Sequence, residues 1–115
     1  MRHNVFHMTK SKGILFDKNL QHLAGMYKVL AHPARLAILK YLAESKTCIT
    51  GDISEQLPLA RTTINQHLAE LKAAGLIKGE ICGVKMKYCL NTKMIRTLKI
   101  NSLEFMNDLM IDLNC

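Results

Sequence analysis

The sequence predicts a mainly α-helical domain with one small β-hairpin, in the order helix, helix, helix–turn–helix, hairpin, helix. Apolar residues recur at helical spacing in several segments, and a glycine-containing turn separates two strand-like stretches. The third observation is size, because 115 residues, 49% of them hydrophobic, supply one compact core. We expect residues 13–115 to form a single domain, and this length argues against a two-domain enzyme.

The N-terminal part predicts an arm followed by two helices. Residues 1–12 are basic with few hydrophobes, so we expect a flexible arm. The next apolar residues share helical spacing and predict a first helix over about Asp17–Leu30: Phe16, Leu20, Leu23, Tyr27 and Leu30. Pro33 suits the first turn of a second helix, which closes near Glu44.

A helix–turn–helix is predicted over about residues 51–73. Thr50 can cap a short helix over about 51–57, which a proline ends. A further helix runs from about Ala60 to Ala73 before Gly75 supplies a left-handed C-terminal cap. Its inward side carries Ile64, Leu68 and Leu71. Ala60 offers no capping oxygen, so the sequence defines the start of this helix only to within one turn.

The C-terminal part predicts a hairpin and a last helix. Residues 76–91 form two short strands around Gly83-Val84. Residues 93–113 return to helical spacing, with apolar side chains in two stripes. The complete order is therefore α-α-α-α-β-β-α. One stripe of the last helix can face this domain, whereas the other needs a partner.

The charge is strongly basic and unevenly distributed. The formal net charge is +7, all 16 Lys and Arg lie within residues 1–100, and residues 101–115 carry only acidic charges. Such a chain attracts polyanions, nucleic acids among them. No apolar run approaches the roughly 18 residues that cross a bilayer, and no targeting segment is evident. We therefore expect no membrane partner and a cytoplasmic location.

The outward face of the 60–73 helix carries the clearest functional pattern. With its apolar side turned inward, its first turns expose groups that can hydrogen-bond: Arg61, Thr62, Thr63, Asn65 and Gln66. Arg can make bidentate hydrogen bonds to guanine, Asn or Gln can hydrogen-bond to adenine, and Thr can contact phosphate or a thymine methyl group. The hairpin adds side chains suited to backbone phosphates: Lys78, Lys85 and Lys87. The alternative interpretation is a solvated helix face and a solvated hairpin tip.

Two short motifs and the basic hairpin resemble one known family. They are Ala31-His32-Pro33-Ala34-Arg35, and His67-Leu68-Ala69-Glu70-Leu71 leading to Ala74-Gly75-Leu76. Within residues 28–91 this order resembles the ArsR-type (ArsR/SmtB) family of winged helix-turn-helix repressors, over more than half of the chain. The resemblance implies a homodimeric bacterial repressor whose second motif helix enters the major groove of double-stranded DNA, flanked by the hairpin as a wing. Where many relatives begin that helix with Ser-Gln, this chain has Ala60-Arg61, so the operator sequence cannot be carried over.

A homodimer on a palindromic site is the expected assembly. A chain of this length has a radius of gyration of about 13 Å and spans about one turn of duplex. Two-fold pairing places two reading helices in successive major grooves about 34 Å apart. The expected interface joins the first and last helices through Leu20, Leu23, Tyr27, Leu103, Met106, Met110 and Leu113. The alternative is that the N-terminal arm covers the surplus stripe within one chain.

No metal site and no cofactor are expected. By the family resemblance, the thiolate pair of arsenic and cadmium sensors falls on Ile49-Thr50-Gly51-Asp52, where only the Asp is kept. One neighbouring thiol cannot supply the three or four soft ligands that such metals require. The zinc pattern that other members carry on the last helix has no counterpart either, since residues 93–115 contain no His.

The four cysteines are expected to be reduced thiols, because there is no CxxC pair. The hairpin turn disfavours a disulfide between Cys82 and Cys89. His3 and His7, and Cys48 and Cys115, offer only weak options for metal or redox sensing. The effector is therefore not readable from the sequence.

Two other functional classes stay open. A winged-helix module for protein interaction or dimerisation would keep the fold without reading DNA, although Arg61, Gln66 and the hairpin lysines argue against it. An enzyme has less support, because the histidines have no activating Ser or Cys neighbour and phosphate-binding glycine loops are missing. His67, beside core-facing Leu68, is interpreted as structural.

Overall fold

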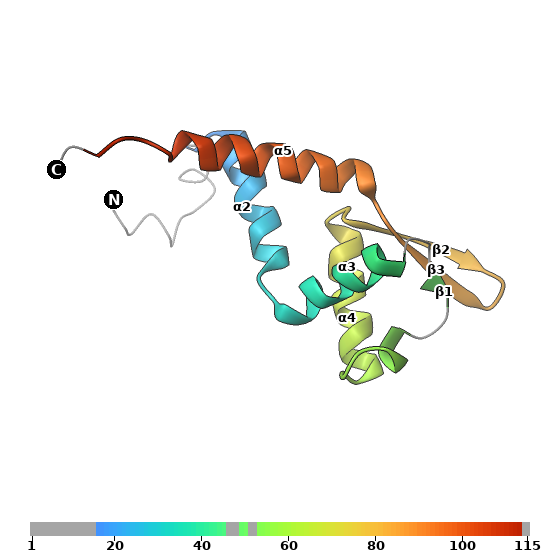
Figure 1. Ribbon diagram of the computed structural model, residues 1–115. Helices are drawn as coiled ribbons and strands as arrows, with labels where there is room; N and C mark the ends of the chain where they lie inside the picture. Colours follow the sequence, from blue (N-terminus) through green and yellow to red (C-terminus); the bar gives the residue numbers. More distant parts are fainter. Residues whose placement is uncertain (1–15, 46–48, 51–52, 114–115) are drawn as a thin grey trace.

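The computed structural model describes residues 16–45, 49–50 and 53–113, in which four α-helices accompany a three-stranded sheet (Figure 1). In chain order the elements are α2 (Lys18–Leu30), α3 (Pro33–Ser45), β1 (Ile49–Thr50), the 3-10 turn η2 (Ile53–Glu55), α4 (Arg61–Ala73), β2 (Ile77–Cys82), β3 (Lys85–Leu90) and α5 (Thr92–Asp108). The mainly helical class with a hairpin is confirmed. The predicted arm of residues 1–12 lies outside the described residues.

Local chemistry explains where the helices begin. The Asp17 carboxylate caps α2 by accepting from the Asn19 backbone N–H at 3.1 Å. Asn91 caps α5 in the same way, accepting from the Met94 N–H at 3.3 Å. Ala60 precedes α4 in an extended conformation and gives it no side-chain cap, as its chemistry predicts.

The segment before α4 differs from the prediction. Instead of an α-helix over 51–57, the described residues contain a single 3-10 turn, Ile53–Glu55. Thr50, predicted as a helix cap, lies in β1, which pairs antiparallel with β3 so that Ile49 stands opposite Tyr88. β-Branched residues suit a strand, and the exposed edge of β3 supplies the partner that a short helix would lack.

The hairpin follows the predicted bounds to within one residue. The sheet order is β1-β3-β2, and the turn places Gly83 at φ +65°, which favours glycine. Cys82 stands opposite Lys85 and Cys89 opposite Lys78, so the register keeps these two cysteines apart, as expected. Cys82 is an exposed free thiol. Cys89 corrects one expectation, because it is disulfide-bonded rather than a reduced thiol.

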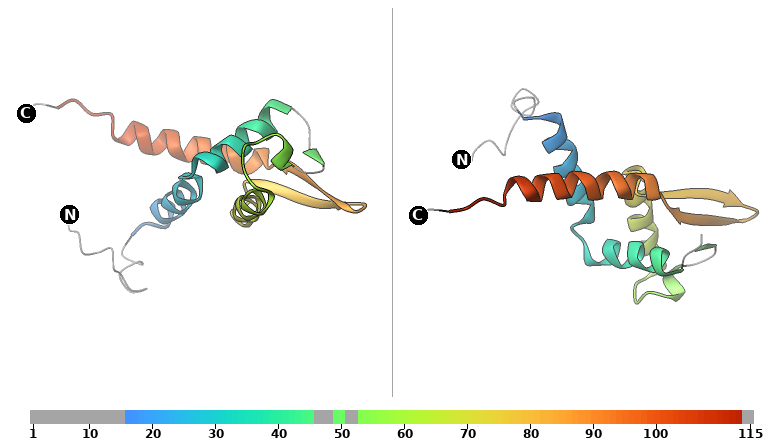
Figure 2. Two further views of the ribbon diagram at one scale, coloured as in Figure 1. Left: turned by 90° about the horizontal axis from the view of Figure 1, so that it is seen from below. Right: turned by 45° about the horizontal axis from the view of Figure 1, so that its top comes forward.

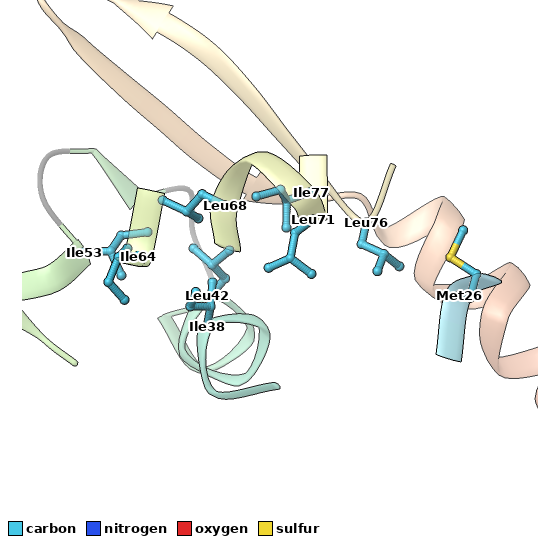
Figure 3. Packing of buried hydrophobic residues seen from close by; sticks show 9 residues of the cluster. All are labelled: Met26, Ile38, Leu42, Ile53, Ile64, Leu68, Leu71, Leu76 and Ile77. Atoms are coloured by element: carbon cyan, nitrogen blue, oxygen red, sulfur yellow. The ribbon is translucent and has the colours of Figure 1, made fainter. Parts of the chain in front are cut away.

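One apolar cluster holds α3, η2, α4 and the hairpin together (Figure 3). Its fully buried members are Ile38, Ile53, Ile64, Leu71, Leu76 and Ile77. Each such aliphatic side chain contributes roughly 1.5–3 kcal/mol through burial. Met26 of α2 extends the cluster to the end that lies beside α5. This packing fixes which side of α4 faces solvent.

The last helix is shorter than predicted. α5 ends at Asp108, and residues 109–113 are not helical, so Met110 and Leu113 follow the helix instead of belonging to it. The acidic end explains this, because its last turn has no basic residue and carboxylates there oppose the helix dipole. No residue of α5 is buried.

The molecule is more elongated than its length predicts. The radius of gyration is 17.4 Å rather than about 13 Å, because α5 and the hairpin extend to opposite sides of the helical core (Figure 2). Much of the surface of α5 is therefore not covered by the rest of the chain.

Candidate nucleic-acid interface

The outward face of α4 is set by its buried side. Ile64, Leu68 and Leu71 have at most 3% of their surface exposed and pack on α3, so the opposite side of the helix faces solvent. Thr62 and Gln66 are exposed there, and the first acidic residue of α4 is Glu70. The predicted outward position of these two side chains is what the structure shows.

Three other predicted residues meet in a cleft between α4 and the hairpin. Arg61 and Asn65 on the flank of α4, together with Lys85 after the hairpin turn, line an open cleft of about 420 Å³. Its apolar lining is Ile53, Leu68, Met86 and Tyr88. A cleft with two cationic side chains and a carboxamide suits a phosphate and its sugar. Thr63, half-buried, does not line it.

By alternation all three hairpin lysines lie on the sheet face away from Met86 and Tyr88, and only Lys85, next to the turn, borders the cleft. Residues that stand opposite one another in an antiparallel pair share a face, which groups Lys78 and Glu80 with Lys87. Met86 and Tyr88 occupy the inward face, where both approach the Cβ position of Gly79. Glu80 stands directly opposite Lys87 and offsets part of its charge.

Met86 and Tyr88 are residues of the cleft that the sequence analysis missed. Alternation along β3 separates them from Lys85 and Lys87, and this period of two was the available signal. The start of α4 also borders this site, and the side chain of its N-cap residue, Ala60, makes no hydrogen bond to the first N–H groups of the helix. Uncapped amide groups at a helix N-terminus favour phosphate.

A polar contact joins α4 to the scaffold behind it. The Arg35 Nε donates to His67 Nδ1 at 3.0 Å, and the Arg35 Nη1 donates to the Val29 carbonyl at 3.0 Å. The His32 ring lies 5.7 Å from the His67 ring, centroid to centroid. Desolvation by burial, and next the positive charges of Arg35 and His32, lower the pKa of His67 below 6.5. The structural role inferred for His67 agrees with these contacts.

The predicted dimer residues fall into distinct environments. Leu23 is only 6% exposed and belongs to the core of its own chain, so it offers a partner little surface. Tyr27 is half-buried, and its hydroxyl donates to Ser102 Oγ at 2.8 Å, joining α2 to α5. Leu20, Leu103 and Met106 remain about half exposed. Met110 and Leu113 are exposed beyond the end of α5.

An apolar groove runs between α2 and α5. Its volume is about 370 Å³, and it is lined by Phe16, Leu20, Gln21, Leu23, Ala24, Tyr27 and Phe105. Of the described helices, none is long and apolar enough to cross a bilayer. Within residues 16–45, 49–50 and 53–113, no three His, Cys, Asp or Glu side chains gather as metal ligands. Gly51, Asp52, Cys48, Cys115 and the two N-terminal histidines lie outside these ranges.

A helix with a polar outward face, a turn before it and a β-hairpin after it define a winged helix-turn-helix protein. Residues 30–80 match a family model described as a helix-turn-helix domain. The transcriptional repressor SmtB of Mycobacterium tuberculosis is 37% identical over 65 residues, which are 56% of this chain and 47% of that protein. This chain therefore spans about half the length of that curated relative.

Solved structures agree with this class. An ArsR-like transcriptional regulator from a Rhodococcus species has a TM-score of 0.56 and 26% identity, covering 81% of this chain and 91% of that one. A homodimeric winged helix-turn-helix DNA-binding domain from Mycobacterium bovis has a TM-score of 0.58 and 23% identity, covering 91% of this chain and 92% of that one. The chain belongs to the ArsR/SmtB family of helix-turn-helix transcriptional regulators.

Proposed function

We propose that the chain is a homodimeric, sequence-specific DNA-binding repressor that occupies a palindromic operator in the cytoplasm and is released by an unidentified signal. The observation that carries the proposal is the outward face of α4, where Thr62 and Gln66 expose hydrogen-bonding groups with no acid before Glu70. Because the other side of α4 is locked in the core, this face is held rigidly, as base readout requires.

The cleft beside α4 supports the same proposal. Arg61, Asn65 and Lys85 bring donors together between the helix and the wing. In this position they suit a phosphate of the strand that borders the groove entered by α4. Thr62 and Gln66 then read bases, and the three cleft residues fix the register of the protein on the duplex. Lys78 and Lys87, on the wing face away from Met86 and Tyr88, are proposed as additional phosphate contacts.

The uncovered surface of α2 and α5 supports a homodimer. α5 has no buried residue, and Ile100, Leu103 and Met106 each have about half of their surface exposed. Leu20 and the groove between α2 and α5 add further exposed apolar side chains, and we infer that a second copy covers part of this surface. The similar Mycobacterium bovis domain is described as homodimeric.

The charge of α5 favours an antiparallel pair. Lys93, Arg96 and Lys99 lie in its first half, whereas Glu104 and Asp108 lie near its end. Two copies related by a two-fold axis place the basic half of one helix beside the acidic end of the other. A parallel arrangement would instead bring like charges together.

Fluorescence anisotropy at two salt concentrations tests the DNA interface. Labelled duplex from upstream of the gene is compared with random duplex, for the wild type and for Arg61→Ala plus Gln66→Ala. The wild type should show a steep salt slope, and the double variant should lose its preference for the specific duplex. Lys18→Ala plus Asn19→Ala, which removes one cation and one carboxamide at the far end of α2, is the matched control and should keep that preference.

Equal preference in the Arg61/Gln66 variant and the wild type would defeat the residue assignment. Salt-independent binding to a protein, with no affinity for any duplex, would favour the protein-interaction module instead.

Sedimentation equilibrium tests the dimer separately. Leu103→Glu places a charge in the proposed interface and should give monomers. The control is Leu36→Glu on α3, which should remain dimeric. The two leucines are almost equally exposed, Leu103 to 51% and Leu36 to 52%. Monomeric wild type at micromolar concentration would contradict the proposed assembly.

A further inference from the structure

The Arg35–His67 pair links three elements that the proposed function uses. Arg35 extends from α3, its guanidinium holds the Val29 carbonyl in the last turn of α2, and its Nε holds His67 on α4. Since α2 belongs to the proposed dimer surface and α4 to the reading face, this side chain connects the two. The remaining contacts between α3 and α4 in the core cluster are apolar, and apolar contacts are not directional. The hydrogen bond is directional and therefore adds a restraint on the orientation of α4 to the apolar packing that sets its inward side.

The contact exists only when His67 is neutral. Arg35 can only donate, so His67 Nδ1 must carry a lone pair, and its proton must sit on Nε2. A proton on Nδ1 would remove the acceptor and place a second cation against the guanidinium. The effect is local, because one hydrogen bond is lost while the apolar cluster around Ile64, Leu68 and Leu71 stays in place.

The charged neighbours of His67 oppose its protonation. Arg35 faces it from α3, and His32 faces it from the residue before α3, with the ring planes tilted by 46°. Glu70 stands one turn further along α4, yet burial and the two cationic groups set the direction of the shift, which lowers the pKa of His67. His67 therefore becomes charged only when the pH falls below the ordinary pKa of a histidine.

We propose that His67 is a positioning residue for DNA binding: its neutral form, held by Arg35, keeps α4 in the orientation that reads DNA, and its protonation weakens that binding. This inference rests on the proposed function, because it concerns the same helix. It adds a dependence on proton concentration that the outward residues Thr62 and Gln66 cannot provide, since neither titrates.

His67→Asn separates positioning from packing. The asparagine Oδ1 occupies nearly the position of Nδ1 and accepts from Arg35 at every pH, but it cannot be protonated there. His22→Asn, at an exposed histidine of α2, is the matched control for the general gain in affinity that any added positive charge gives. Anisotropy titrations at constant ionic strength at pH 7.5 and 5.5 compare the two variants with the wild type, and thermal unfolding at each pH confirms that all remain folded.

Between pH 7.5 and pH 5.5 the wild type and His22→Asn should lose affinity relative to His67→Asn, because only these two proteins carry an imidazole at position 67 that can be protonated. Identical pH profiles for His67→Asn and the wild type would overturn the inference while leaving the proposed function intact. Failure of the wild type to bind any duplex at either pH would overturn the proposed function, and this inference with it.

A measurement without substitution covers the case in which His67→Asn does not fold. The imidazole of His67 is titrated by NMR in the free protein and in the complex with duplex. DNA should lower the pKa of His67 in the complex, because the bound orientation requires the neutral ring. An unchanged or raised pKa in the complex would overturn the inference.

Discussion

Leu71→Ala tests whether the inner side of α4 holds the reading helix in place. Leu71 is fully buried among α3, α4 and the hairpin, so truncation removes apolar burial and leaves a cavity. Leu→Ala at such sites costs about 2–5 kcal/mol, a large fraction of the 5–15 kcal/mol that stabilises a typical domain. With an unfolding entropy of about 2.1 cal/mol/K per residue, a loss of 3 kcal/mol lowers Tm by roughly 12 °C.

The matched control is Leu36→Ala on α3, where about half of the side chain is already exposed (52%). This substitution should cost less than about 1 kcal/mol, because little apolar surface is lost and no cavity forms. Urea unfolding followed by circular dichroism at one fixed protein concentration compares the two, since dimerisation makes the apparent stability depend on concentration. Equal losses in the two variants would refute the assigned inner face of α4.

Three further predictions can be checked by thermal or urea unfolding. Gly75→Ala should destabilise by about 1–2 kcal/mol, since Gly75 has φ +80° and a Cβ would lie 3.3 Å from Met94 Cε, whereas Gly25→Ala, with open space and an ordinary φ, should stabilise by about 0.5–1 kcal/mol. Asn91→Ala should cost about 1–2 kcal/mol, because it loses the α5 cap and the 2.8 Å bond to the Gly75 carbonyl; no loss would contradict the cap. The free energy of unfolding should fall as pH drops below 6.5, because the unfolded chain protonates His67 more readily than the folded one, and His67→Asn should lack that component.

Helix positions were predictable from the sequence where a local chemical rule sets the boundary. Asp17 and Pro33 mark the starts of α2 and α3 because capping and proline geometry act over a few residues. β1 was missed because two residues carry no alternation, and its partner Tyr88 lies far along the chain. The overrun of the last helix has a similar cause: apolar spacing continues past Asp108, but the helix ends where its capping and charges are unfavourable.

The part of the candidate site that lies on α4 was predictable, because it depends on a local pattern in the sequence. Helical periodicity alone places Thr62 and Gln66 outward, so the reading face follows from the positions of the apolar residues. The wing is different, because the register of β2 and β3 places Lys78, Lys85 and Lys87 on one face, and only the cleft geometry shows that Lys85, beside the turn, borders the cleft. Cross-strand register depends on contacts that no single segment of sequence contains.

Hydroxyl-radical footprinting tests the central claim most directly, that two copies of α4 enter successive major grooves. On DNA from upstream of the gene, at low salt, the wild type should protect two symmetric patches whose centres lie about one helical turn apart. Leu103→Glu, as a monomer, should protect neither patch at the same concentration. Uniform cleavage with the wild type across the whole fragment would contradict the account.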